Sequence, residues 1–140
     1  MTVGLLVITH QPLGADLLRV ATDIFGAHPA RAEALEVAND SPRELVLAHA
    51  QRLAQQLDEG DGVLILTDIY GATPANLALA LRDRHPHARV VAGVNLPMLL
   101  RALTYAGLDL DAVADKALTG GRDGVCLCPT RDSGGAADGA

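Results

Sequence analysis

Short apolar runs alternate with helical periods along the chain. Continuous apolar runs of strand length, which are typical of strands buried on both faces, cover Val3–Thr9, Val63–Leu66 and Arg89–Val94. A fourth run, Glu33–Val37, alternates apolar and polar residues, and this pattern favours an outer strand. A last short strand is predicted at Val125–Cys128, with both cysteines packed on one side of it.

Between these runs, apolar residues recur every three or four positions, as they do on one face of an α-helix. In the second and third helices, Ser or Thr is expected to cap the amino end, with Pro as the first helical residue. The five predicted helices run from about Gly14 to Phe25, from Ser41-Pro42 to near Gly60, onward from Thr73-Pro74, from Leu96 to Gly107, and from Leu110 to Gly120-Gly121.

Strands that alternate with helices of this length predict right-handed βαβ crossovers. The fold class is therefore α/β, a small doubly wound, mostly parallel sheet with helices on both faces. One domain over residues 1–128 accounts for the pattern. Residues 129–140, rich in Gly, Ala, Asp and Ser, are expected to form a flexible tail.

Composition narrows the classes of function. The 140 residues include three aromatic residues and a single lysine, Lys116, and the net charge is −6. A chain with neither a basic surplus nor aromatic stacking platforms is not expected to bind nucleic acid. No apolar stretch is long enough for a membrane span, and the amino end lacks the pattern of a secretory signal. With only two cysteines, two positions apart, the sequence predicts a cytoplasmic protein.

Candidate chemistry follows the strands. Open α/β sheets bind ligands beyond the carboxyl ends of their strands, near the point where the strand order reverses. His10 follows the first strand, Asp68 follows the third, and Asn95–Met98 follows the fourth. Neutral imidazole is a competent nucleophile near neutral pH, so His10 is the candidate acceptor of a phosphoryl group. Asp68 is the candidate group that fixes the ring tautomer and stabilises the cation formed.

The surroundings of His10 are expected to favour an anion. The amides at the start of the next helix point toward negative charge, and Thr73 with the amides behind it offers further donors. The sequence contains no P-loop, no Gly-x-Gly-x-x-Gly after a strand, and no lysine near a strand end. The phosphoryl group is therefore expected to come from another protein, and neither a cofactor nor a metal ion is predicted.

Four segments together resemble a known family. In order along Met1 to about Cys128, they match the mannose-type enzyme IIA domains of the bacterial phosphoenolpyruvate-dependent sugar phosphotransferase system. Each segment alone is a weak signal, but four in register with matching spacing are specific. The segments are Thr9-His10, Asp68–Asn76, Ala92–Met98 and Gly121–Val125.

The resemblance implies a role for each matching residue. His10 would accept a phosphoryl group from the phosphocarrier protein HPr and pass it to a IIB domain or a regulatory acceptor. Asp68 would orient the ring, and the loop Gly71-Ala72-Thr73 would lie beside the phosphohistidine. Family members form homodimers, in some of which the last strand, here Val125–Cys128, is antiparallel or exchanged between subunits.

One departure and three alternatives accompany this reading. The family commonly has glycine after the histidine, whereas here Gln11-Pro12 follows, and Pro12 lacks an amide hydrogen for phosphate.

The chain also fits the phosphotransfer subunit of a dihydroxyacetone kinase system, or a receiver-like signalling domain phosphorylated on Asp68. The receiver alternative lacks the acidic pair that would hold Mg²⁺ after the first strand. A flavin or nucleotide module would need an aromatic partner and a hydroxyl-rich loop, and Gln11–Gly14 supplies neither.

Overall fold

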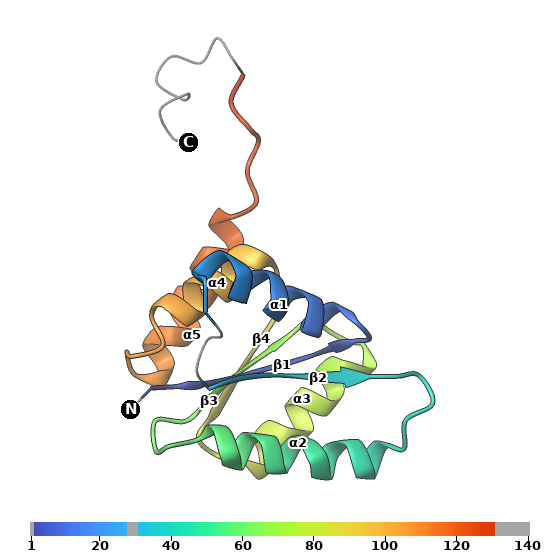
Figure 1. Cartoon of the computed structure of the whole chain (residues 1–140). Coiled ribbons are helices and arrows are strands. Elements are labelled where there is room, and N and C mark those ends of the chain that lie inside the picture. Colours follow the sequence, from blue (N-terminus) through green and yellow to red (C-terminus); the bar gives the residue numbers. More distant parts are fainter. Residues whose placement is uncertain (1, 28–30, 131–140) are drawn as a thin grey trace.

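The computed structural model describes residues 2–27 and 31–130 (Figure 1). Its four strands form one parallel sheet in the order β2-β1-β3-β4. This arrangement confirms the predicted α/β class and the parallel sheet. The strands are β1 (Gly4–His10), β2 (Ala32–Val37), β3 (Val63–Thr67) and β4 (Ala88–Ala92).

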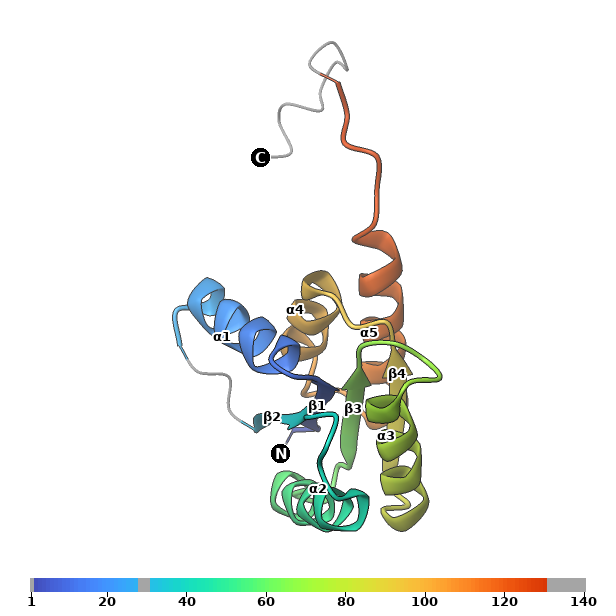
Figure 2. The same cartoon turned by 90° about the vertical axis from the view of Figure 1, so that its right-hand side faces the viewer.

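The helices cover both faces of the sheet, as a doubly wound fold requires. Figure 2 shows α1, α4 and α5 above the sheet and α2 and α3 below it. Each predicted helix is present, with ends that differ from the prediction by a few residues. The helices are α1 (Leu13–Phe25), α2 (Arg43–Leu57), α3 (Thr73–Arg84), α4 (Leu96–Thr104) and α5 (Leu110–Asp123).

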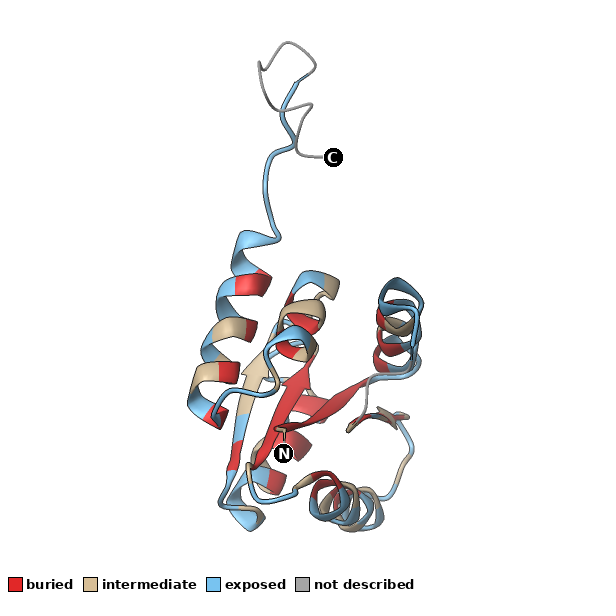
Figure 3. Ribbon diagram, turned by 60° about the vertical axis from the view of Figure 1, so that its left-hand side comes forward, coloured by how far each residue is buried: buried red, intermediate tan, exposed pale blue. Residues whose placement is uncertain are grey.

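Two apolar cores, one on each face, hold these layers together. Alternate side chains of β1 point to opposite faces, so Leu5 and Val7 pack with α1, α4 and α5, whereas Leu6 and Ile8 pack with α2 and α3. The central strands are buried throughout their apolar runs, and the outer sides of the helices are exposed (Figure 3). The apolar runs of β1 and β3 therefore predicted the two central strands correctly.

The two outer strands differ in how well the sequence predicted them. The alternating strand β2 lies at one edge, as predicted. The prediction that Arg89–Val94 is buried on both faces was wrong, because β4 forms the other edge. Arg89 is exposed there, and Val90 and Val91 are half-buried. An apolar run of this length is compatible with an edge strand whose outer side is covered only in part.

The prediction that the last helix ends at Gly120-Gly121 was wrong, because α5 continues to Asp123. A Cβ atom at Gly120 would lie 2.7 Å from Cβ of Arg101, and one at Gly121 would lie 2.7 Å from Cε of Met98. The absence of a side chain at both positions therefore allows α4 to pack closely against α5.

The predicted strand at Val125–Cys128 is absent, since these residues form no regular element after α5. Val125 and Leu127 are 77% and 98% exposed, and Cys126 and Cys128 are exposed as well. In the single chain, therefore, the two cysteines do not show the predicted packing on a strand. Most of the predicted tail, residues 131–140, lies outside the described residues.

Candidate functional site

His10 and Asp68 meet at the carboxyl edge of the sheet. His10 is the last residue of β1, and Asp68 directly follows β3. These two strands are neighbours. The chain crosses from β1 to β2 on one side, and from β2 it returns past β1 to β3 on the other side. This is the point where the strand order reverses, which is the usual ligand position in such sheets. The sequence predicted both the edge and the pair.

One oxygen of Asp68 binds His10 twice. Oδ2 lies 2.7 Å from ring Nδ1 and accepts a hydrogen bond from the His10 amide at 3.0 Å. The other oxygen, Oδ1, accepts from the Ile69 amide at 3.0 Å. Because an ionised carboxylate only accepts, Nδ1 carries the hydrogen, and in the neutral ring Nε2 then keeps its lone pair. No described residue makes a hydrogen bond to Nε2, and the His10 side chain is 46% exposed.

The environment of Asp68 keeps its carboxylate ionised. Partial burial acts to raise the pKa of Asp68, but the hydrogen bonds and the charge of His10, with the bond from the Ile69 amide, outweigh it. The net effect places the pKa of Asp68 below its ordinary value of 3.8. Near neutral pH the carboxylate can therefore stabilise positive charge on the imidazole ring.

A second histidine–aspartate pair has the same contact distance but a different setting. His85 Nε2 lies 2.7 Å from Asp58 Oδ2. Asp58 follows α2 and His85 follows α3, so this pair lies at the opposite, amino edge of the sheet. The His85 side chain is only 15% exposed. Contact distance alone therefore does not single out His10, whereas exposure and position at the carboxyl edge do.

The start of α1, which is expected to favour an anion, is partly occupied by side chains of the chain itself. The Gly14 amide donates to Thr9 Oγ1 at 2.7 Å, and the Ala15 amide donates to Glu36 Oε1 at 2.8 Å. These contacts satisfy donors that a helix start normally leaves open. Sequence reasoning missed Glu36, and its one signal was a charged residue on the same face of the strand as Ala32 and Ala34.

Helix α3 begins one residue earlier than the sequence predicted. The prediction that Thr73 caps α3 was wrong, because Ala72 is the N-cap residue and makes no side-chain cap. Thr73 is instead the first helical residue and is exposed. Gly71 has φ of +91°, a conformation that favours glycine. The first turn of α3 therefore has no side-chain oxygen on its amides.

Asn95 has a structural role. Its side-chain oxygen accepts from the Met98 amide at 2.9 Å, and its side-chain nitrogen donates to the Gly121 carbonyl at 3.0 Å. The segment after the fourth strand therefore caps α4 and ties it to α5, and these contacts do not involve His10.

The surface beside His10 is a shallow hollow of about 230 Å³. Within residues 2–27 and 31–130, no three His, Cys, Asp or Glu side chains gather where they could hold a metal ion. The same residues include no helix with the length and apolar character that crossing a membrane requires. The hollow is lined by His10, Gln11, Val37, Ala38 and Asn39.

The fold and the exposed, carboxylate-bound histidine are suited to a group-transfer domain. Residues 4–118 match the EIIA-man family, described as the PTS system fructose IIA component. The PTS system mannose-specific EIIAB component of Escherichia coli strain K12 is 32% identical over 127 residues. The chain belongs to this family of phosphotransferase-system IIA components.

The matched region covers 89% of this chain but 39% of the E. coli relative, so the chain spans about two-fifths of that relative's length. Solved structures share the fold. The mannose/sorbose-specific IIA subunit from Enterococcus faecalis matches with a TM-score of 0.83 at 23% identity, covering 94% of this chain and 98% of that one. The EIIA component from Streptococcus agalactiae matches with a TM-score of 0.80 at 23% identity, covering 89% and 96%.

Proposed function

We propose that Nε2 of His10 is the atom that accepts the phosphoryl group. The observation that carries this proposal is the pairing of ring Nδ1 with Asp68 at 2.7 Å, which leaves Nε2 of this exposed side chain without a partner among the described residues. A ring held by one nitrogen presents the lone pair of the other in a fixed direction. The chain is thus a transferase component that acts through a phosphohistidine.

The reaction is a transfer between two imidazole rings. Nε2 of His10 forms a bond to phosphorus while the bond between phosphorus and the donor nitrogen breaks, and the donor leaves as neutral imidazole. Phosphorylated His10 gains positive charge on its ring, and Asp68 stabilises this charge through Nδ1. Positioning and charge stabilisation therefore supply the catalysis, as in phosphoryl transfer generally.

The loop Gly71-Ala72-Thr73 is the proposed binding segment for the phosphoryl oxygens. Two observations support it over the start of α1. The amides of Gly14 and Ala15 already have oxygen partners, whereas α3 begins without a side-chain cap. The exposed Thr73 hydroxyl and the Thr73 amide would then hold the phosphoryl group, as helix starts commonly do, whereas Pro74 has no amide hydrogen to offer.

The proposed partners are HPr as donor and a IIB domain or a regulatory target as acceptor. The name of the E. coli relative, an EIIAB component, supports a IIB acceptor. We place this relay in the cytoplasm, and we propose that the chain acts as a homodimer. The exposed apolar side chains of Val125 and Leu127 support pairing of Val125–Cys128 with a second copy as a strand.

Incubation with phosphoenolpyruvate, enzyme I and HPr tests the acceptor. We expect label on the wild-type chain and on His85→Ala, and none on His10→Ala. The control fits because His85 makes the same 2.7 Å contact with an aspartate at the other edge of the sheet. Label that persists in His10→Ala would refute the assignment of the acceptor.

The stability of the label separates His10 from Asp68 as acceptor. Phosphohistidine is stable in base and labile in acid, whereas an acyl phosphate on Asp68 is labile in base. Three hydrogen bonds already occupy the Asp68 carboxylate, and this argues against the receiver-like alternative. A dihydroxyacetone kinase system would differ in the acceptor, so labelled chain offered to each class of acceptor distinguishes the two roles.

A further inference from the structure

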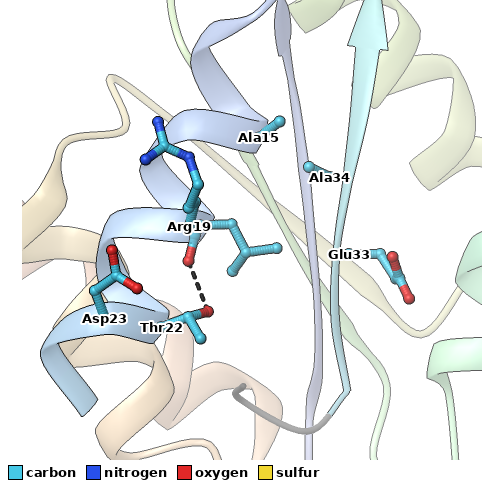
Figure 4. A pocket seen from close by; sticks show the side chains of 7 residues that line it. Ala15, Arg19, Thr22, Asp23, Glu33 and Ala34 are labelled. Atoms are coloured by element: carbon cyan, nitrogen blue, oxygen red, sulfur yellow. Dashed lines mark hydrogen bonds between the residues drawn. The ribbon is translucent and has the colours of Figure 1, made fainter. Parts of the chain in front are cut away.

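Glu36 lies on the face of β2 that contacts α1. Figure 4 shows Ala34 directed toward α1 and Glu33 directed away from it. Glu36 is two positions beyond Ala34, so it shares the inner face, and it pairs in register with Thr9. Its Oε1 accepts the Ala15 amide at 2.8 Å. A carboxylate on β2 is thus the N-terminal cap of a helix from another part of the chain.

The second oxygen of Glu36 is not accounted for by capping. Oε2 is buried and has no hydrogen-bond partner among the described residues. A buried polar atom without a partner costs free energy, and a capping oxygen can be supplied by uncharged residues. The negative charge of Glu36 is therefore more than the packing of α1 requires.

That charge lies one residue pair from the proposed phosphoryl acceptor, whose position in β1 faces the other side of the sheet. Glu36 pairs with Thr9 and the following residue pair is His10 with Val37, so Glu36 is one residue pair from His10 in the register of β1 and β2. The start of a helix attracts anions through its amides and its dipole. At the start of α1, the Ala15 amide already donates to the Glu36 carboxylate, and the Gly14 amide donates to the Thr9 hydroxyl.

We propose that Glu36 is a positioning residue that sets how readily phosphorylated His10 gives up its phosphoryl group. Its carboxylate accepts the Ala15 amide at the start of α1, offsets part of the attraction of that helix start for an anion, and repels the phosphoryl charge. Phosphohistidine is thereby less stable than it would be beside an open helix start. This inference rests on the proposed function, because it concerns the same phosphohistidine.

The size of the effect follows from Coulomb's law. A single negative charge acting on a phosphoryl group of about two negative charges, at a separation on the order of 10 Å, changes its equilibrium by roughly fourfold if the charges are screened as in bulk water, and by more where protein lies between them. The effect raises the transfer potential of phosphorylated His10. A carrier needs this property, since it must release the group to the next protein.

The matched variants are Glu36→Gln and Glu33→Gln. Each removes one negative charge from β2, but Glu33 points away from α1 and lies three residues farther from the strand end. Glutamine at position 36 keeps an oxygen acceptor for the Ala15 amide. Each variant is mixed with phosphorylated HPr, and the ratio of the two phosphoproteins is measured at equilibrium.

We expect Glu36→Gln to shift the equilibrium toward the phosphorylated chain by at least about threefold, and Glu33→Gln by less than about twofold. An equal ratio in Glu36→Gln and wild type would overturn the inference and leave Glu36 as a structural cap only. Glu36→Ala should lower the melting temperature in either case, so stability does not decide the question. If the wild-type chain takes no label from HPr, the proposed function itself fails, and this outcome is distinct from an unshifted equilibrium.

Discussion

A single carboxylate oxygen, Oδ2 of Asp68, holds His10 at both its ring nitrogen Nδ1 and its backbone amide, at 2.7 and 3.0 Å. The backbone contact fixes the end of β1 against the start of the β3–α3 loop, and the ring contact fixes the direction of the imidazole. Asp68 therefore positions the nucleophile and, because its pKa is lowered, keeps the negative charge that stabilises the phosphorylated ring.

Asp68→Asn should slow phosphorylation of the chain by HPr by roughly 10²-fold or more, the scale seen when an orienting carboxylate is lost. The amide keeps the shape of the side chain but removes its charge and allows the wrong ring tautomer. Labelling time courses at several HPr concentrations measure the effect. Asp83→Asn, at an exposed carboxylate on α3, is the control. A rate within about twofold of wild type would contradict the role of Asp68.

The sequence was sufficient to predict the edge of the sheet at which the site lies, because the position of that edge follows from geometry that all parallel sheets share. His10 and Asp68 are 58 residues apart, yet each follows a buried apolar run. Once β1 and β3 are central parallel strands, their carboxyl ends must meet. The pairing therefore required only the strand assignments and no knowledge of side-chain contacts.

Local details of the site could not be predicted because they depend on tertiary contacts. Propensity favours Thr73 as a cap, but the chain enters α3 one residue earlier. Glycine commonly ends a helix, but α5 continues through Gly120 and Gly121. At these two positions the absence of a side chain allows α4 to pack closely against α5. The cap of α1 comes from Glu36, and no local pattern connects that residue to Ala15.

Gly14→Ala should destabilise the chain by about 1–3 kcal/mol, the usual range for overpacking a buried position. A Cβ atom at Gly14 would lie 2.8 Å from Thr9 Oγ1, the oxygen that accepts the Gly14 amide. The same Thr9 hydroxyl donates to the His10 carbonyl at 3.0 Å, so phosphorylation should slow as well. Urea unfolding measures the stability. Gly107→Ala, where a Cβ meets no atom within 4 Å, should change it by less than about 0.5 kcal/mol.

Asn95→Ala should lower the free energy of unfolding by about 2 kcal/mol, because one helix cap and one further hydrogen bond are lost. The side chain joins the start of α4 to the Gly121 carbonyl of α5. Thermal and urea unfolding check this value, with Asn76→Ala on the exposed side of α3 as the comparison. A labelling rate close to wild type in the folded variant would agree with a structural role for Asn95, and loss of labelling without loss of stability would refute it.

The His85–Asp58 pair should make the stability of the fold depend on pH. Burial acts to raise the pKa of Asp58, but the Gly60 amide, the His85 ring and the Gly62 amide outweigh it, so the pKa lies below 3.8. Since the folded-state pKa is lowered, the unfolded chain binds the proton more tightly. The stabilisation is present above the unfolded-state pKa and is lost as the pH falls through the folded-state pKa.

Asp58→Asn should therefore lose about 2 kcal/mol at pH 7, the scale of hydrogen bonds to a charged group, and much less at acidic pH. Urea unfolding from pH 7 down to about pH 3 measures this, and the gap between wild type and variant should narrow as the pH falls. Asp83→Asn removes a carboxylate that is 75% exposed and should follow the wild-type curve. Because the pair lies at the amino edge of the sheet, folded Asp58→Asn should still take label on His10. A gap that stays constant with pH would show that the Asp58 charge does not stabilise the fold.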